Sequence, residues 1–354
     1  MNTGKLQSHS SPSAPSRASP FALSARHREL ALAGIVAAIA LLVGLRAPVF
    51  LTLGNLLDVV NDSAILAILV MGQMVVLLTR GIDLSVASNL ALTGMFCAVL
   101  GKHYPGLGAA ELVLIALAFG ALLGAINGAL ITGFDLPPIV VTLGTMSAYR
   151  GAIFVLSKGA WINDQDIHPA IKGLPRIQFL GLPGLVWFAL AILLLCVWFF
   201  RYRRAGREMY ALGGNPSAAA YIGIPIKRRL LQVYAMSGAL AGLAGLLWVG
   251  RYSIAFTELA SGYELTVIAA CVIGGISTAG GLGTVAGGLL GVLFAGVVNG
   301  ALPVIHISPF WQQAISGMVI LVAVVANARS ERRLGKQILP LRERSSAAIQ
   351  GARP

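Results

Sequence analysis

The side chains that most often carry catalysis or bind metals are sparse in this chain. The histidines occur singly, at positions 9, 27, 103, 168 and 306. A zinc site needs several His or Cys ligands at close spacing, so this pattern argues against one. The cysteines lie inside apolar runs, which indicates buried thiols rather than disulfides or metal ligands: Cys97, Cys196 and Cys271.

The glycine-rich segment GGISTAGGLGTVAGG (274–288) has the composition of a phosphate-binding loop but not its chemistry. It lacks the Gly-Lys-Ser/Thr that places a lysine on the phosphates of a nucleotide. It also follows an apolar helix rather than a strand, so the dinucleotide fingerprint fails as well. If ATP drives any process here, a separate chain must hydrolyse it.

With metal and nucleotide sites excluded, the remaining candidate functional residues are neutral polar side chains inside the apolar runs. If those runs cross a membrane, amides and hydroxyls at that depth would line a wet path. From polarity and depth alone we assign the path to Gln73, Asn89, Thr145, Asn299 and Gln312. Carboxylates are nearly absent from the runs, with Glu111, Asp135 and Glu264 at their ends. Ion-coupled carriers place Asp, Glu or His on the ion path, so this absence counts against ion coupling.

Composition identifies the elements that must position these residues. Of the 354 residues, 57% are apolar and 11% are charged, and mean hydropathy is +0.82. Soluble domains carry about 25% charged residues, which excludes an ordinary soluble enzyme or a disordered chain. We predict an all-α integral membrane protein with about ten spans, each needing ~20 apolar residues. The spans are 30–47, 63–79, 84–101, 111–132, 138–157, 183–200, 229–249, 264–281, 283–302 and 309–327.

The net charge of +13 is explained by topology rather than by nucleic acid. Most of the Lys and Arg residues lie in segments 1–29, 201–229 and 328–354. Cytoplasmic segments of membrane proteins collect such residues, so both termini and the 201–229 loop belong in the cytoplasm. The expected organisation is a disordered tail at 1–29, a membrane domain at 30–327 and a basic tail at 328–354 that lies along anionic lipid.

Small residues recur every four positions in three predicted spans. Such stripes let helix backbones approach closely, so tight packing is the first interpretation. The stripes are Gly120, Gly124 and Gly128; Gly238 and Gly242; and Gly283, Gly287 and Gly291, followed by Ala295 and Asn299. NGAL at 127–130 recurs at 299–302, after a stripe each time. The spans that carry the two copies run in opposite senses, which indicates an inverted internal repeat with the path between its halves, unless the match is convergence or chance.

The polar segment RGIDLSVAS (80–88) has two interpretations. In the structural one, Gly81 ends one span and Asp83 caps the next, accepting its free N–H groups. In the functional one, Ser85, Ser88 and Asn89 share a helix face and line a wet path.

The loop 201–229 is the most organised segment between spans. It reads as a basic anchor, a short helix at 207–212, a Gly-Gly-Asn turn and a second short helix at 216–222 that stops at Gly223. Asn215 is placed to cap the second helix, with Pro216 at its first position. Two short helices here indicate either docking of a soluble partner or an interfacial helix on anionic lipid.

Within this loop, SAAAYIG (217–223) resembles the coupling loop of ATP-binding-cassette (ABC) importer permeases, Glu-Ala-Ala-x-x-x-Gly. Ala218, Ala219 and Gly223 match that pattern, whereas Ser217 replaces the glutamate. The departure is in keeping with one branch, the permeases for ribose, xylose, arabinose, galactosides, rhamnose and the autoinducer-2 signal. Five segments resemble that branch in the right order across about residues 30–328: TRGIDLSVAS (79–88), PPIVVTLGTMSAYRG (137–151), YALGGNPSAAAYIGI (210–224), IAACVIGGIS (268–277) and SPFWQQAISGMVILVAVV (308–325). WINDQ (161–165) and YELTVIAACVIGG (263–275) look most like the rhamnose and autoinducer-2 members.

The resemblance implies a permease subunit of a monosaccharide importer in the bacterial inner membrane, paired with a second copy or a paralogue. It implies ABC ATPase subunits below, a periplasmic sugar-binding protein above, and no cofactor bound by this chain, since the partner uses the ATP. The residues that would couple ATPase closure to the helices are Arg207, Glu208, Gly213, Asn215, Ala218, Ala219 and Gly223. The external loop 158–182 would receive the binding protein through Trp161, Asp164 and Asp166, or is simply solvated.

Two other functions remain as alternatives. An ion-coupled secondary sugar transporter would work without an ATPase, and the repeat favours it while the missing carboxylates oppose it. A purely structural membrane protein would leave the organised 201–229 loop unexplained.

Overall fold

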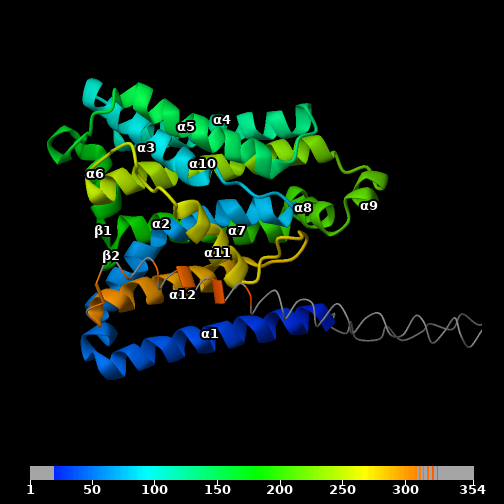
Figure 1. The fold of residues 1–354 in the computed structure, drawn as a ribbon, viewed down its shortest axis with the longest axis horizontal. Helices are drawn as coiled ribbons and strands as arrows, with labels where there is room; N and C mark the ends of the chain where they lie inside the picture. Colours follow the sequence, from blue (N-terminus) through cyan, green and yellow to red (C-terminus); the bar gives the residue numbers. More distant parts are fainter. Residues whose placement is uncertain are drawn as a thin grey trace, which may run out of the picture.

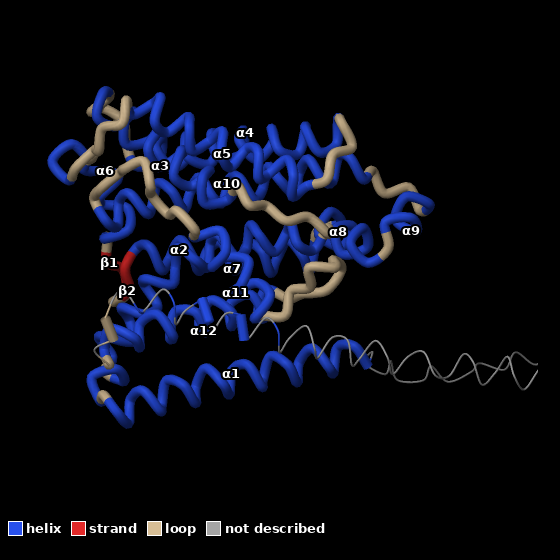
Figure 2. Tube along the Cα trace, viewed as in Figure 1, coloured by secondary structure: helices blue, strands red, loops and turns tan. Residues whose placement is uncertain are grey.

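The computed structural model describes residues 20–305 and, beyond them, positions 307, 308, 311, 314, 317, 318, 321, 322 and 325. The long helices lie side by side between two ends of a bundle (Figures 1 and 2). In chain order the elements are α1 (Pro20–Arg46), the 3-10 helix η1 (Pro48–Leu51), α2 (Leu53–Leu78), α3 (Val86–His103), α4 (Ala109–Gly133), α5 (Pro138–Ser157), the 3-10 helix η2 (Asp164–Asp166), α6 (Pro169–Arg176), β1 (Gln178–Phe179), β2 (Leu182–Pro183), α7 (Gly184–Tyr202), α8 (Arg204–Gly214), α9 (Pro216–Tyr221), α10 (Ile226–Tyr252), α11 (Tyr263–Ile273) and α12 (Val285–Val304).

The two ends of the bundle differ. One end, here called the α6 end, carries α6 and the antiparallel pair β1–β2 (Figure 1). The opposite end, the α9 end, carries α8, α9 and the beginning of α1. The basic loop 201–229 therefore lies at the same end as the start of α1, as the charge pattern predicts.

Helix α2 forms the centre of the bundle. Every residue from Ser63 to Leu78 is buried, and α2 packs against α7, α10, α11 and α12. A helix that is apolar all round is stable where neighbours cover it on every side. By contrast, α1, α5 and α7 leave many large apolar side chains exposed, as helices that face lipid do.

Helices α4 and α10 share the most extensive interface, and the glycine stripes form it. A Cβ on Gly238 would lie 2.7 Å from Gly124 Cα, and one on Gly120 would lie 2.7 Å from Gly242 Cα. The backbones are thus in direct contact, which only glycine permits. The packing interpretation of these two stripes is confirmed.

The stripe in α12 packs differently. Gly287 and Gly291 contact the backbone of α11, at Gly274 and Ala270. Gly283 lies outside the helix, and Asn299 at the far end of the stripe is exposed. Helices α4 and α12 run in opposite directions in Figure 1, as an inverted repeat requires.

Seven described helices are long and apolar enough to cross a membrane. The prediction of ten spans is compatible with this result but is not confirmed by it, and the tenth, 309–327, falls largely outside the described residues. The eighth predicted span, 264–281, is wrong in extent. Helix α11 ends at Ile273, and Gly274 and Gly275 follow it. Gly275 adopts a left-handed φ of 80°, which ends the helix.

The tails assigned from sequence are only partly covered by the structure. Residues 1–19 and 326–354 lie outside the described residues. Residues 20–29, which we expected in the disordered tail, are helical, because α1 begins at Pro20.

Candidate coupling site

The loop between α7 and α10 folds into two short helices, as predicted. Helix α8 spans Arg204–Gly214, longer than the expected 207–212, and α9 spans Pro216–Tyr221. The Asn215 side chain accepts a hydrogen bond from Ala218 N (3.0 Å), and Pro216 occupies the first position of α9. This N-cap is confirmed.

Helix α9 ends in a tight turn that requires glycine. Gly223 has a left-handed φ of 81°, and the next residue, Ile224, donates its N–H to Ala219 O (3.0 Å). A glycine in this conformation lets the chain leave the helix without steric cost. The predicted stop at Gly223 is therefore confirmed.

One face of α9 packs and the other is exposed. Ala219 is buried in a small apolar cluster with Leu212 and Ile224. Tyr221 and Ile222 point away, with 94% and 71% of their surface exposed. Exposed apolar side chains of this size are typical of surfaces that contact a protein partner or a membrane.

Glu208 anchors α8 to the start of α10. Its carboxylate is buried and accepts from Arg204 Nε (2.6 Å) and Arg229 Nε (2.5 Å). Burial alone would raise the pKa of this carboxyl, but the hydrogen bonds and charges of the two arginines outweigh it, so the net pKa lies below the ordinary value. Arg207, the neighbouring residue in the predicted coupling set, is instead exposed and donates to Tyr202 O (3.2 Å).

Gly213 lies where α8 meets the end of α2. A Cβ on Gly213 would collide with Leu78 O and would lie 2.5 Å from Gly281 N. Gly213 therefore packs against the bundle, whereas Asn215 and Ala218 are exposed at the tip of the loop.

The structure does not bring the predicted path residues together. The Gln73 amide, in the orientation that satisfies both of its polar atoms, donates to Asp83 O and accepts from Asp83 N, each at 3.2 Å. Asn89 is buried and donates to Gly120 O (3.2 Å). Thr145 donates to Val141 O within α5. Asn299 is exposed on α12 and Gln312 lies outside the described residues, so the path stays a prediction.

Asp83 does not cap the helix that follows, and that prediction is wrong. The helix begins after Ser85, and Asp83 accepts from Ser85 N (2.9 Å), Ser85 Oγ (2.6 Å) and Ser237 Oγ (3.2 Å). Segment 79–85 turns back into the bundle after α2, so this carboxylate is buried among helices rather than placed at a span end. Non-helical backbone is tolerated at such depth only when protein surrounds it.

Sequence reasoning also missed two partners of this segment. Ser237 reaches it from α10, and the Asn127 amide donates to Ser85 Oγ (2.8 Å) from α4. NGAL contained Asn127, but its role depends on a contact with a residue 42 positions earlier. Short-range patterns carry no signal for such a contact.

At the α6 end, the three predicted docking residues lie in or just before η2. Trp161 is 58% exposed and packs against Phe256, with 5.4 Å between the ring centroids and the ring planes tilted by 40°. Asp166 pairs with Lys102 (3.0 Å) and Asp164 with Lys172 (3.3 Å). Hydrogen bonds from Ser253 and Lys172 hold the pKa of Asp164 below its ordinary value.

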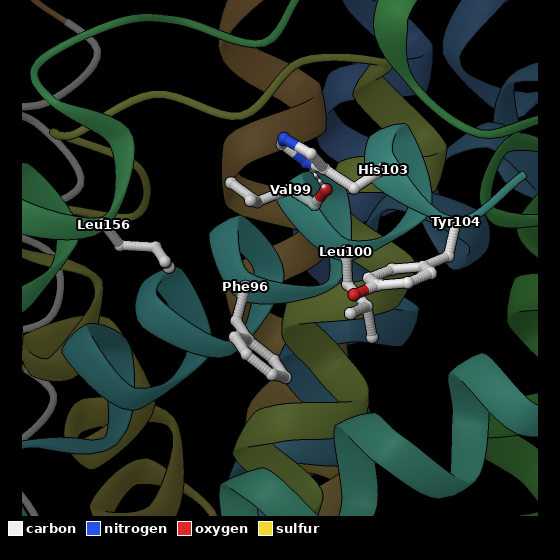
Figure 3. Close-up of a pocket in the computed structure, with 6 residues that line it drawn as sticks. All are labelled: Phe96, Val99, Leu100, His103, Tyr104 and Leu156. Atoms are coloured by element: carbon white, nitrogen blue, oxygen red, sulfur yellow. Dashed lines mark hydrogen bonds between the residues drawn. The ribbon is translucent and has the colours of Figure 1, made fainter.

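A shallow hollow of about 270 Å³ opens between α3 and α5 near the α6 end. Figure 3 shows Phe96, Val99, Leu100, His103, Tyr104 and Leu156 around it. His103 Nδ1 lies 2.8 Å from Val99 O, within its own helix turn. None of the predicted path residues lines this hollow.

Comparison with known proteins agrees with this architecture. The family model described as "Branched-chain amino acid transport system / permease component" matches residues 55–324. The autoinducer 2 import system permease protein LsrC of Klebsiella pneumoniae is 36% identical over 312 residues, 88% of this chain and 89% of that protein. The ribose import permease protein RbsC of Escherichia coli K12 is 37% identical over 290 residues, 80% of this chain and 88% of that protein.

A probable ABC transporter permease protein of Sinorhizobium fredii, y4mJ, is 36% identical over 317 residues, 88% of this chain and 93% of that protein. No solved structure matches the chain. The resemblance stated from the sequence motifs is confirmed, and the chain is a multi-pass membrane protein that serves transport. It belongs to the family of branched-chain amino acid transport system permease components, the membrane subunits of ABC importers.

Proposed function

We propose that this chain is the membrane subunit through which an ATP-driven importer moves a monosaccharide or a similar uncharged, hydroxyl-rich solute. Relatives named for ribose and for autoinducer 2 support this solute class.

The ATPase subunits dock at the α9 end in this proposal. Tyr221 and Ile222 supply an apolar tip, and Arg201 and Arg203 add exposed positive charge at the start of the same loop. The pair of Glu208 with Arg229 holds α8 on α10, so a displacement of the tip is passed to the bundle rather than lost in a flexible loop.

A soluble solute-binding protein docks at the opposite end. Trp161 supplies an exposed aromatic anchor, and the ion pairs of Asp164 with Lys172 and of Asp166 with Lys102 supply a charged rim beside it. Aromatic residues with a charged rim are typical of protein interfaces. Binding at this end and ATP use at the other make transport directional.

The chain lies in the bacterial inner membrane with both termini and the α9 end in the cytoplasm, as its basic residues favour. It pairs with a second copy or a paralogue and binds no cofactor itself, since ATP is used by the partner. The path residues Gln73, Asn89, Thr145, Asn299 and Gln312 contact the solute only in a state that opens the bundle.

The exposed tip of α9 on a rigidly held loop is the observation that carries this proposal. The test is co-purification of the ATPase subunits with the chain from gently solubilised membranes. Deletion of 215–222, Gly223→Asp or the pair Tyr221→Ala and Ile222→Ala should leave the chain in the membrane but abolish co-purification and uptake.

Tyr104→Ala is the matched control, because Tyr104 is an exposed tyrosine at the α6 end. Full uptake after deletion of 215–222 would contradict the proposal. Uptake that collapses with an uncoupler while ATP is held constant would favour the ion-coupled alternative instead.

A further inference from the structure

Arg80 connects the end of α2 to the end of α8. Its Nε donates to Gly213 O (2.7 Å) and its Nη2 donates to Gly214 O (2.9 Å). These are the last carbonyls of α8, which have no partner within their own helix. A planar guanidinium binds two such acceptors at once and its charge suits the negative end of the helix dipole.

Arg80 also has an unusual backbone conformation, which ends α2. Its φ is 66°, in the left-handed region that non-glycine residues rarely adopt. Holding such a conformation is unfavourable by about 1 kcal/mol or more, so surrounding contacts must stabilise it. Residues in this state cluster at functional sites.

The glycine-rich loop 274–284 closes the same junction from the other side. Gly281 N donates to Leu78 O (2.9 Å), the last carbonyl of α2. Gly280 lies against the Arg80 side chain, and a Cβ on Gly281 would lie 2.6 Å from Gly214 N. Three backbones thus meet around one guanidinium with no room for side chains.

Beyond Arg80, the segment 81–85 is fastened to the interior of the bundle. Thr142 Oγ1 on α5 donates to Ile82 O (3.1 Å). Asp83 is held by Gln73 of α2 and by Ser237 of α10. Ser85 receives the Asn127 amide from α4. Segment 81–85 is therefore hydrogen-bonded to four helices, α2, α4, α5 and α10.

We propose that Arg80 is a positioning residue that passes the displacement of α8 along segment 81–85 to the interior of the bundle. This inference rests on the proposed function, because it takes α8 and α9 as the part that the ATPase moves. In this proposal the movement of α8 reaches the hydrogen bonds of Asp83 and Ser85 inside the bundle, and these two residues do not belong to the solute path.

Loss of the Arg80 side chain leaves α8 attached to the bundle. Glu208 still pairs with Arg229 of α10, and Tyr210 OH still donates to Gly283 O (2.8 Å). Substitution of Arg80 should therefore block the transmission of movement from α8 to the bundle without preventing the ATPase from docking. A residue needed only for folding would affect both.

The test uses the full transporter with its ATPase subunits in lipid nanodiscs, with Arg80→Gln and Arg80→Lys beside the unchanged chain. Arg228→Gln is the matched control, because it removes the same charge from an exposed position at the same end. Hydrogen–deuterium exchange of peptides 207–222 and 79–89 is measured with and without ATP plus vanadate, a probe that needs no solute.

In the unchanged chain and in Arg228→Gln, nucleotide should alter exchange in both peptides. In Arg80→Gln the response of 207–222 should persist, while the response of 79–89 falls about tenfold, within the ~5–150-fold range of coupling between sites. Arg80→Lys should recover part of it, because an ammonium reaches one carbonyl but not both.

An equal response of 79–89 in Arg80→Gln would overturn the proposal, and so would loss of ATPase co-purification in that variant. Absence of any response at 207–222 in the unchanged chain would instead overturn the proposed function, and this inference with it.

Discussion

A single methyl group at Gly238 should destabilise the bundle, because α4 and α10 are in backbone contact there. The added Cβ would lie 2.7 Å from Gly124 Cα and 2.8 Å from Gly124 N. Carbon atoms in contact lie ~3.5–4.0 Å apart, so the helices must separate by about 1 Å. Overpacking of this kind costs about 1–3 kcal/mol, and the upper part of that range applies because backbone atoms cannot rotate away.

The helix preference of alanine opposes this loss. Alanine is more favourable than glycine in a helix by about 1 kcal/mol, so the net destabilisation of Gly238→Ala is about 1–2 kcal/mol. Gly34→Ala is the matched control, since a Cβ there meets no atom of the described residues within 4 Å. Gly34→Ala should therefore show only the stabilisation from the helix preference of alanine, up to about 1 kcal/mol.

The assay is thermal unfolding of the detergent-solubilised protein, with both variants and the unchanged chain measured side by side. The apparent midpoint should fall for Gly238→Ala and should stay level or rise for Gly34→Ala. A midpoint for Gly238→Ala at or above that of Gly34→Ala would refute the close backbone contact on which the packing argument depends.

Three further predictions concern the two ends of the bundle. The pKa of Glu208 is lowered in the folded protein, so its ion pairs stabilise the fold fully above the ordinary carboxyl pKa and are lost as pH falls through the lowered pKa. Between neutral and acidic pH, the thermal unfolding midpoint of Glu208→Gln should therefore vary less than that of the unchanged chain. Asn215→Ala should destabilise α9 by about 1 kcal/mol and speed limited proteolysis within 201–229, whereas Asn215→Asp should preserve the cap and the slower cleavage. Trp161→Ala should weaken capture of the solute-binding protein in a pull-down without reducing ATPase co-purification, and equal loss of both partners would count against a docking role at this residue.

Local chemistry explains what could be predicted from the sequence. Two features depend on neighbours within one or two helical turns: the cap at Asn215 and the glycine stop at Gly223. The glycine stripes depend on how closely two helix backbones approach, as at Gly124 and Gly238. Such features leave direct marks on residue type and spacing. Their positions are therefore confirmed, with only the ends of α8 and α9 shifted.

The rest depends on contacts between residues far apart in the chain. Asp83 has the residue type and position of an N-cap, but its partner Ser237 lies 154 residues away and holds it inside the bundle. Gln73 and Asn89 have the polarity of path residues, yet buried backbone groups of neighbouring segments take up their hydrogen bonds. Polarity at depth does not say whether a side chain faces a solute or an opposing helix.

Helix α11 has a consequence for how the protein enters the membrane. With 11 residues it rises only about 16 Å, roughly half of the ~30 Å hydrocarbon core. The backbone groups of its non-helical flanks, 253–262 and 274–284, find hydrogen-bond partners in protein rather than lipid, as Gly281 N does at Leu78 O and Ala255 N at Ile162 O (2.9 Å each). Insertion machinery that reads hydropathy would accept α10 and α12 as independent spans but not α11. Burial of α11 therefore depends on its contacts with α2 and α12 rather than on its own length and hydropathy, so its place in the bundle requires those neighbours.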